Sequence, residues 1–254
     1  AMWRENETMM KSSSCFLGEM GEAKSSVTED EIQSVVSRRL DANNPTLYTD
    51  EMLTYIRKYH PKEKDPSKIL RLAYYYMRYQ LVHNYYRSYD RGGMLTDDKR
   101  FADGYVGVDP YKFTSIILEV CKRHKIKAEV FVAVPRYYGA IKNVLLVDEL
   151  SVGIVADISG KKVFYFPFNN FSTPDLVNPD IQGTEAYSFV PTLIRSKKVL
   201  NSSKITIPAS SYADNAIAYK LDVTLDDQFE NIKAKRNSVF SGLCKKDMQS
   251  LALY

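Results

Sequence analysis

The sequence predicts an α+β protein in which N-terminal helices pack on an antiparallel sheet and a partial β unit follows. Three observations predict this class. Apolar residues recur at helical spacing in four segments before residue 125, four short strand-like segments follow up to residue 168, and two longer ones come after Pro208. We therefore expect a flexible arm over residues 1–27, a helix-and-sheet core over 28–208 and the start of an incomplete β domain over 209–254.

The first three helices are expected from their capping residues. Thr28 and Glu31 form a capping box that opens a helix to about Leu40. A second helix is expected over residues 49–60. Asp65 followed by a proline provides an N-cap and a first helical residue, so a third helix should run from there to about residue 83.

The fourth helix begins with the same signal, Asp109-Pro110. An amphipathic stripe at helical spacing follows it and indicates a helix that lies buried against a sheet: Phe113, Ile116, Ile117, Val120, Cys121 and His124. The four strand-like segments after it are separated by turn residues, which is typical of an antiparallel meander; they cover residues 128–134, 140–147, 152–158 and 162–168.

Two segments of the core are expected to be irregular, and two strands are expected after it. Residues 84–108 and 174–189 lack a clear period and are expected to be irregular. After Pro208, two long strands are expected over residues 217–225 and 229–240.

Composition excludes several classes of function. The chain is 44% hydrophobic and 26% charged, and its net charge of +4 arises from 35 basic and 31 acidic residues that are interleaved, so we expect no nucleic-acid partner. No apolar run is long enough to span a membrane. The three cysteines are widely spaced and the three histidines are not clustered, so neither a disulfide framework nor a metal site is expected, and no cofactor is expected.

The order of the elements, helices followed by a capped helix on an antiparallel sheet, resembles the transglutaminase-like core of the papain-like cysteine protease superfamily. The similarity is to the bacterial branch, common in Bacteroidetes, in which this core lies between β-sandwich domains, and it covers about residues 65–240. Residues 173–183, which end in Gln182-Gly183, are similar to the family's segment after the catalytic aspartate. The strands after Asn215 are similar to the opening of its C-terminal β domain.

The resemblance also implies what has happened to the catalytic triad. The family uses a thiolate at the start of the core helix, a histidine on the next strands and an aspartate that orients the imidazole. Alignment places Pro110 at the cysteine, Asn143 at the histidine, on the strand expected over residues 140–147, and Phe166 at the aspartate. None of these side chains can replace its counterpart.

Our leading hypothesis is therefore a catalytically inactive transglutaminase-like domain that acts as a binding or scaffold module in a larger envelope protein. The former groove would remain as a concave site for a peptide, protein or glycan ligand. The residues expected near it are Tyr105, Tyr111, Tyr137, Tyr138 and Asn143. An equally weighted alternative is that these tyrosines pack the segment after residue 84 against the sheet.

A rival hypothesis is an active cysteine protease or acyltransferase with a displaced nucleophile. The candidate pair is Cys121 with His124, three residues apart at the C-terminal end of a helix, where the helix dipole opposes a thiolate. A buried structural cysteine is the favoured interpretation of Cys121. The other cysteines, Cys15 and Cys244, lie in a polar arm and near the chain end, and His60 and His83 close helices.

A third hypothesis is a structural spacer within a longer envelope protein. No signal peptide is recognisable in the sequence. Residence in the periplasm or at the cell surface is implied by the family resemblance alone.

Overall fold

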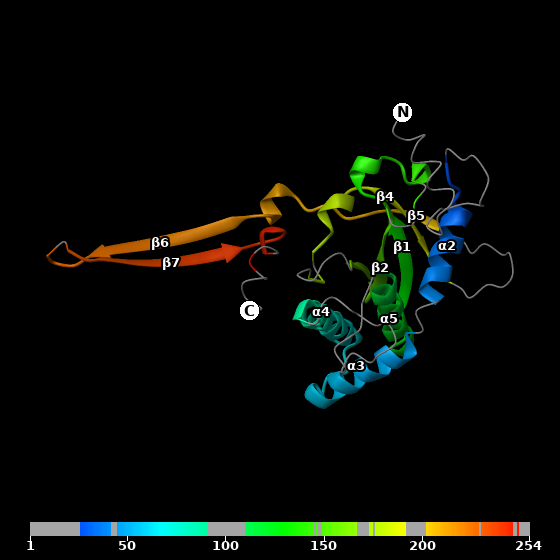
Figure 1. Ribbon diagram of the computed structural model, residues 1–254, viewed down its shortest axis with the longest axis horizontal. Helices are drawn as coiled ribbons and strands as arrows, with labels where there is room; N and C mark the ends of the chain where they lie inside the picture. The colour runs from blue at the N-terminus through cyan, green and yellow to red at the C-terminus, as the bar shows by residue number, and fades with distance from the viewer. Residues whose placement is uncertain are drawn as a thin grey trace. The chain divides into compact units, whose positions relative to one another are not determined.

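The computed structural model divides into two compact units, residues Ala1–Pro208 and Ala209–Tyr254, which are described separately here (Figure 1). The structure describes residues 26–41, 45–90 (side chains to 79), 110–144, 146, 149–166, 173–174, 176–191, 202–228, 230–245 and 248. The arm expected over residues 1–27 therefore lies outside the described residues except for its last two.

The first unit is an α+β fold, so the predicted class is confirmed. Its helices are α2 (Glu29–Asp41), α3 (Thr46–Tyr59), α4 (Pro66–Asp90) and α5 (Pro110–Arg123). One antiparallel sheet has the strand order β3-β2-β1-β4-β5. Its strands are β1 (Lys127–Ala133), β2 (Ser151–Ile158), β3 (Lys161–Tyr165), β4 (Glu185–Phe189) and β5 (Ser203–Thr206).

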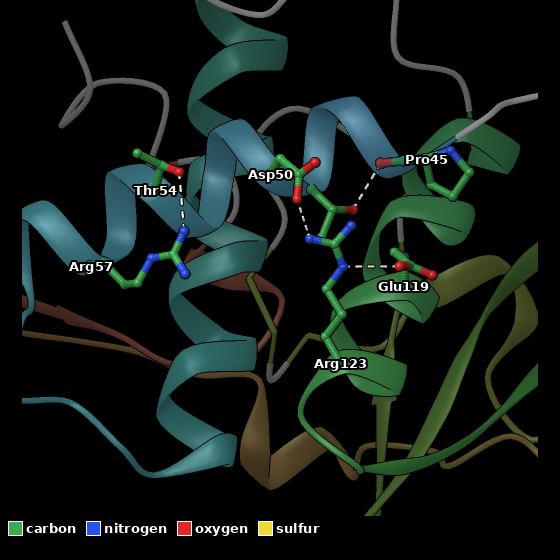
Figure 2. Close-up of polar contacts among 7 residues, drawn as sticks. Pro45, Asp50, Thr54, Arg57, Glu119 and Arg123 are labelled. Atoms are coloured by element: carbon green, nitrogen blue, oxygen red, sulfur yellow. Dashed lines mark hydrogen bonds and ion pairs between the residues drawn. The ribbon is translucent and has the colours of Figure 1, made fainter.

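The capping residues behave largely as the sequence predicts. The Thr28 amide donates to Glu31 Oε2 at 2.8 Å and the Glu31 amide donates to Thr28 Oγ1 at 3.3 Å, which is a complete capping box. Asp65 Oδ1 accepts from the Ser67 amide at 2.9 Å at the start of α4. Helix α3 begins three residues earlier than predicted, and Thr49 lies inside it, where its hydroxyl donates to the Pro45 carbonyl oxygen at 2.9 Å (Figure 2).

Helix α5 is the centre of the first unit. It contacts α2, α3 and α4 as well as strands β1 and β2. We call the side of the sheet that α5 covers the helix face. Alternate strand residues reach the two sides: Val130 and Val132 of β1 lie on the helix face with α2, whereas Phe131 and Ala133 lie on the opposite face.

Two expectations about strands are wrong. Of residues 140–147, the structure describes 140–144 and 146, and these do not form a strand; they contain the 3-10 helix η3 (Ile141–Asn143) and an isolated bridge at Leu146. The reason is that Ile141 and Val144 are buried three residues apart, whereas Lys142 and Asn143 between them are exposed. Residues on one face of a strand are two apart, so this spacing fits a 3-10 turn and not a strand.

The segment over residues 174–189 was expected to be irregular, yet it ends in strand β4, which lies between β1 and β5 in the sheet. Four consecutive residues of β4, Ala186 to Phe189, are buried because both faces of this strand are covered. A short strand that is buried on both sides has no polar-apolar alternation to detect.

The second unit contains a hairpin of strands β6 (Ile217–Leu225) and β7 (Ile232–Phe240). Both strands were expected from the sequence, and β7 begins three residues later than predicted. That residues 209–254 start a longer β domain stays a prediction.

Candidate functional site

The start of α5 is where the resemblance would place a nucleophile. Pro110 is the first residue of the helix and is exposed, and the Thr114 hydroxyl donates to its carbonyl oxygen at 2.7 Å. Asp109, the expected cap, lies outside the described residues. A proline offers neither a thiol nor a backbone N–H at this position, so it starts the helix without contributing a reactive group.

Helix α2 lies over the first turns of α5. Tyr111 is only 7% exposed and belongs to an apolar cluster with Ile32 and Val36 of α2. The Arg39 guanidinium lies 5.2 Å from the centre of the Tyr111 ring, a cation–π contact. Tyr111 was expected near an open groove; it is instead a core residue covered by α2.

The other expected groove residues that the structure describes lie on two short 3-10 helices after β1. Tyr137 and Tyr138 belong to η2 (Arg136–Tyr138), and their ring centres are 4.7 Å apart. Tyr137 is 72% exposed, whereas Tyr138 is half-buried against the cluster that holds Tyr111. Asn143 is exposed at the end of η3. Tyr105 lies outside the described residues.

We call Tyr137 and Tyr138 the tyrosine patch. Its backbone is fixed by Arg136, whose Nη2 donates to the Pro179 carbonyl oxygen at 3.1 Å. Burial and the neighbouring Glu149 carboxylate raise the pKa of Tyr138, which keeps its hydroxyl protonated. The tyrosine patch therefore combines the exposed ring of Tyr137 with the half-buried ring of Tyr138. Such a pair of rings can stack on an aromatic, sugar or peptide surface.

Phe166 directly follows β3 and lies on the opposite face of the sheet. It is 3% exposed, and its ring centre is 5.2 Å from that of Phe131. Its carbonyl oxygen accepts from the Tyr74 hydroxyl at 3.1 Å. The structure therefore places Pro110 at the start of the helix on one face of the sheet and Phe166 on the other face, with Asn143 exposed at the end of η3.

The described cysteines offer no activated thiol in the first unit. Cys121 is 1% exposed in the core between α5 and its neighbouring helices, and burial raises the pKa of its thiol to about 12. His124 lies one turn further on; burial, followed by the charges of Arg123 and Arg57, lowers its pKa. Cys244 is half-buried in the second unit, and Cys15 lies outside the described residues.

A charged cluster that the sequence analysis did not identify joins the end of α5 to α3 (Figure 2). Arg123 Nε donates to Glu119 Oε1 at 2.9 Å, and its Nη1 pairs with Asp50. Hydrogen bonds to these two carboxylates raise the pKa of Arg123, first through Asp50 and then through Glu119. Only the Glu119–Arg123 pair, spaced four residues apart on one helix, was readable from sequence. The cluster is partly exposed and holds two helices together.

A metal site needs clustered ligands, and a membrane span needs a long apolar helix. Among the residues that the structure describes, no group of three or more His, Cys, Asp or Glu side chains is arranged to hold a metal ion. No helix in the same part of the chain is long and apolar enough to cross a membrane.

No protein-family model matches the chain, and no curated protein matches it. One solved structure that resembles it is described as a "putative protease" from Parabacteroides distasonis ATCC 8503. The two are 11% identical with a TM-score of 0.38, and the match covers 78% of this chain and 37% of the other.

Proposed function

We propose that this chain is a catalytically inactive transglutaminase-like domain that acts as a binding or scaffold module in a larger envelope protein. The observation that carries the proposal is the pair of residues at the start of α5. In the alignment that the family resemblance implies, Pro110 takes the position of the nucleophile, and the next residue, Tyr111, is buried under α2. Acyl transfer needs a nucleophilic side chain beside the substrate carbonyl, and neither Pro110 nor the buried Tyr111 supplies one.

The chemistry of the described cysteines supports the same proposal. A thiol with a pKa of about 12 is almost entirely protonated near neutral pH, and Cys121 is also inaccessible. His124 cannot activate it from its place in the fold, since no hydrogen bond between the two is found among the described side chains. These facts argue against the rival hypothesis of a displaced nucleophile at Cys121.

The binding role is assigned to the tyrosine patch. Tyr137 is the more exposed of the two rings, and Arg136 beside it holds the loop against η5 (Pro179–Ile181). Exposed aromatic rings on a fixed backbone lose little conformational entropy when they bind, which suits a peptide or glycan ligand. Residence in the periplasm or at the cell surface is part of the proposal and rests on the family resemblance.

The test uses a matched pair of tyrosine substitutions. The chain is screened against a peptide library and a glycan array, and the binders are then titrated by calorimetry. Tyr137→Ala should weaken binding at least about tenfold, as expected for loss of a stacking ring. Tyr212→Ala, which removes a ring that is 93% exposed in the second unit, should leave binding unchanged. Equal effects of the two substitutions, or cleavage of the bound ligand, would contradict the proposal.

A further inference from the structure

The hairpin of the second unit has one apolar face. Residues paired across the two strands share a face, and the register pairs Tyr219 with Ser238, Leu221 with Arg236 and Val223 with Ala234. The same side carries Ile217 with Phe240 at one end and Leu225 with Ile232 at the other. We call these ten residues the hairpin apolar face; the residues of β6 and β7 between them form the other side, which carries Lys220, Asp222, Lys233 and Lys235.

This face is open to solvent. The five β6 residues of the face expose between 52% and 67% of their surface, and Ile232 exposes 71%. A two-stranded sheet has no second layer of its own, so its apolar residues stay in water unless another surface covers them. A contiguous row of large apolar side chains of this kind marks an interaction surface.

The hairpin is also held rigidly at its base. Asn215 Oδ1 accepts from the Leu243 amide at 2.8 Å, and Asn215 Nδ2 donates to the Ser211 carbonyl oxygen at 2.8 Å. Gly242 has a φ of +54°, and a Cβ there would lie 2.2 Å from Asn215 Oδ1, so the turn needs glycine.

The connection at the far end of the hairpin is fixed in the same way. Asp226 Oδ1 accepts from the Glu230 amide at 2.9 Å, and Asp226 Oδ2 accepts from Asn231 Nδ2 at 2.6 Å. With both ends hydrogen-bonded, the face is formed before any partner arrives, which lowers the entropy cost of association.

We propose that the hairpin apolar face pairs with the same face of a second copy of this chain. The register makes the face complementary to itself. When two hairpins are related by a twofold axis along the strands, each β6 lies over the partner's β7, so that Val223 faces a small Ala234 and Tyr219 faces a small Ser238. The other twofold arrangement, with β7 over β7, would bring two Arg236 side chains together and is disfavoured.

The amount of apolar surface fits this partner. Six exposed side chains that each bury on the order of 100 Å² give about 600 Å² per copy, or about 1,200 Å² in total, which is the lower end of the range for a stable interface. In this arrangement the guanidinium of Arg236, which lies 5.1 Å from the Tyr219 ring centre in its own chain, also faces Leu221 of the second copy. The Arg236 charge therefore stays over the Tyr219 ring and does not face the Arg236 charge of the second copy.

The test uses two valine-to-aspartate variants that differ only in the face they change. Val223 on the apolar face and Val239 on the other side are both exposed, and each is paired with an alanine across the hairpin. Sedimentation velocity over a wide concentration range should show a monomer–dimer equilibrium for the unmodified chain and for Val239→Asp. Val223→Asp should raise the dissociation constant at least about tenfold, because each copy would have to remove a carboxylate from water in an apolar interface.

A cross-linking experiment covers the case in which Val223→Asp unfolds the hairpin. One preparation carries Val223→Cys and the other Ala234→Cys, both in a background with Cys15 and Cys244 changed to serine. Oxidation of the mixture should give a disulfide-linked heterodimer, and replacing Val223→Cys by Val239→Cys should abolish it. A chain that remains monomeric at every concentration, equal effects of the two aspartate variants, or equal cross-linking from both faces would overturn the proposal.

Discussion

The hydroxyl oxygen of Ser115 in α5 lies 3.1 Å from the carbonyl oxygen of Leu40, near the end of α2. It also lies 2.8 Å from the carbonyl oxygen of Tyr111, so its single proton is shared between the two acceptors. Ser115 is buried, and the contact joins residues 75 positions apart. This hydrogen bond ties α2 to the helix whose start it covers.

Replacement of Ser115 by alanine should destabilise the protein by about 1 kcal/mol, since the buried Leu40 carbonyl loses a donor. Urea denaturation monitored by circular dichroism measures the change. Ser34→Ala on the exposed side of α2 is the control and should change the free energy of unfolding by less than about 0.5 kcal/mol. If both variants behave alike, the hydroxyl does not contribute to holding α2 in place.

Cys121 should resist alkylation in the folded protein. Its thiol is buried and has a pKa of about 12, so little thiolate forms near neutral pH. Peptide mass spectrometry after iodoacetamide treatment should find Cys121 unmodified in native protein and modified after denaturation. Rapid labelling of native Cys121 would revive the hypothesis of a displaced nucleophile.

Gly153 of β2 has no room for a side chain. A Cβ there would lie 2.4 Å from Phe131 Cζ and 2.6 Å from the Tyr165 carbonyl oxygen. Gly153→Ala should therefore cost on the order of 1–3 kcal/mol of unfolding free energy. In a Phe131→Leu background the same change should cost less, because part of the clash is gone. Strict additivity in this double-mutant cycle would show that the ring is not the obstacle.

His124 should make stability depend on pH. Burial, together with the charges of Arg123 and Arg57, lowers its pKa, so the native state binds a proton less readily than the unfolded chain. The contribution of neutral His124 to the free energy of unfolding is complete above the pKa of an unfolded histidine, about 6.5. It is lost as the pH falls below that value. The difference in urea midpoint between about pH 7.5 and pH 5.5 should shrink in His124→Gln. If the difference in urea midpoint is the same in His124→Gln, the acid sensitivity of the protein comes from other titratable side chains.

The elements that depend on local chemistry could be predicted from sequence. The capping box of Thr28 and Glu31 needs only residues within one turn, and the stripe of α5 needs only its own spacing. The same holds for β6, whose bounds match the prediction because its alternation is regular over nine residues. Local signals of this kind do not depend on where other segments pack.

The placement of the candidate site could not be predicted in the same way. Tyr111 is buried because α2 packs on it, and nothing near Tyr111 in sequence specifies that contact. The face that Phe166 occupies depends on the register between β2 and β3, and a shift of one residue would reverse it. Asn143 was placed on a strand because residues 140–147 as a whole were taken as strand-like, whereas the buried Ile141 and Val144 have the spacing of a 3-10 turn.

The proposed function makes this chain catalytically inactive, and one assay separates that proposal from an active cysteine enzyme. The chain is incubated with casein, with a mixed peptide library and with a glutamine–amine acyl-transfer pair, and products are followed by mass spectrometry beside a variant in which Cys15, Cys121 and Cys244 are all replaced by serine. We expect no turnover above the blank and no difference between the two proteins. Turnover that disappears in the cysteine-free variant would contradict the proposal and identify the chain as an active cysteine enzyme.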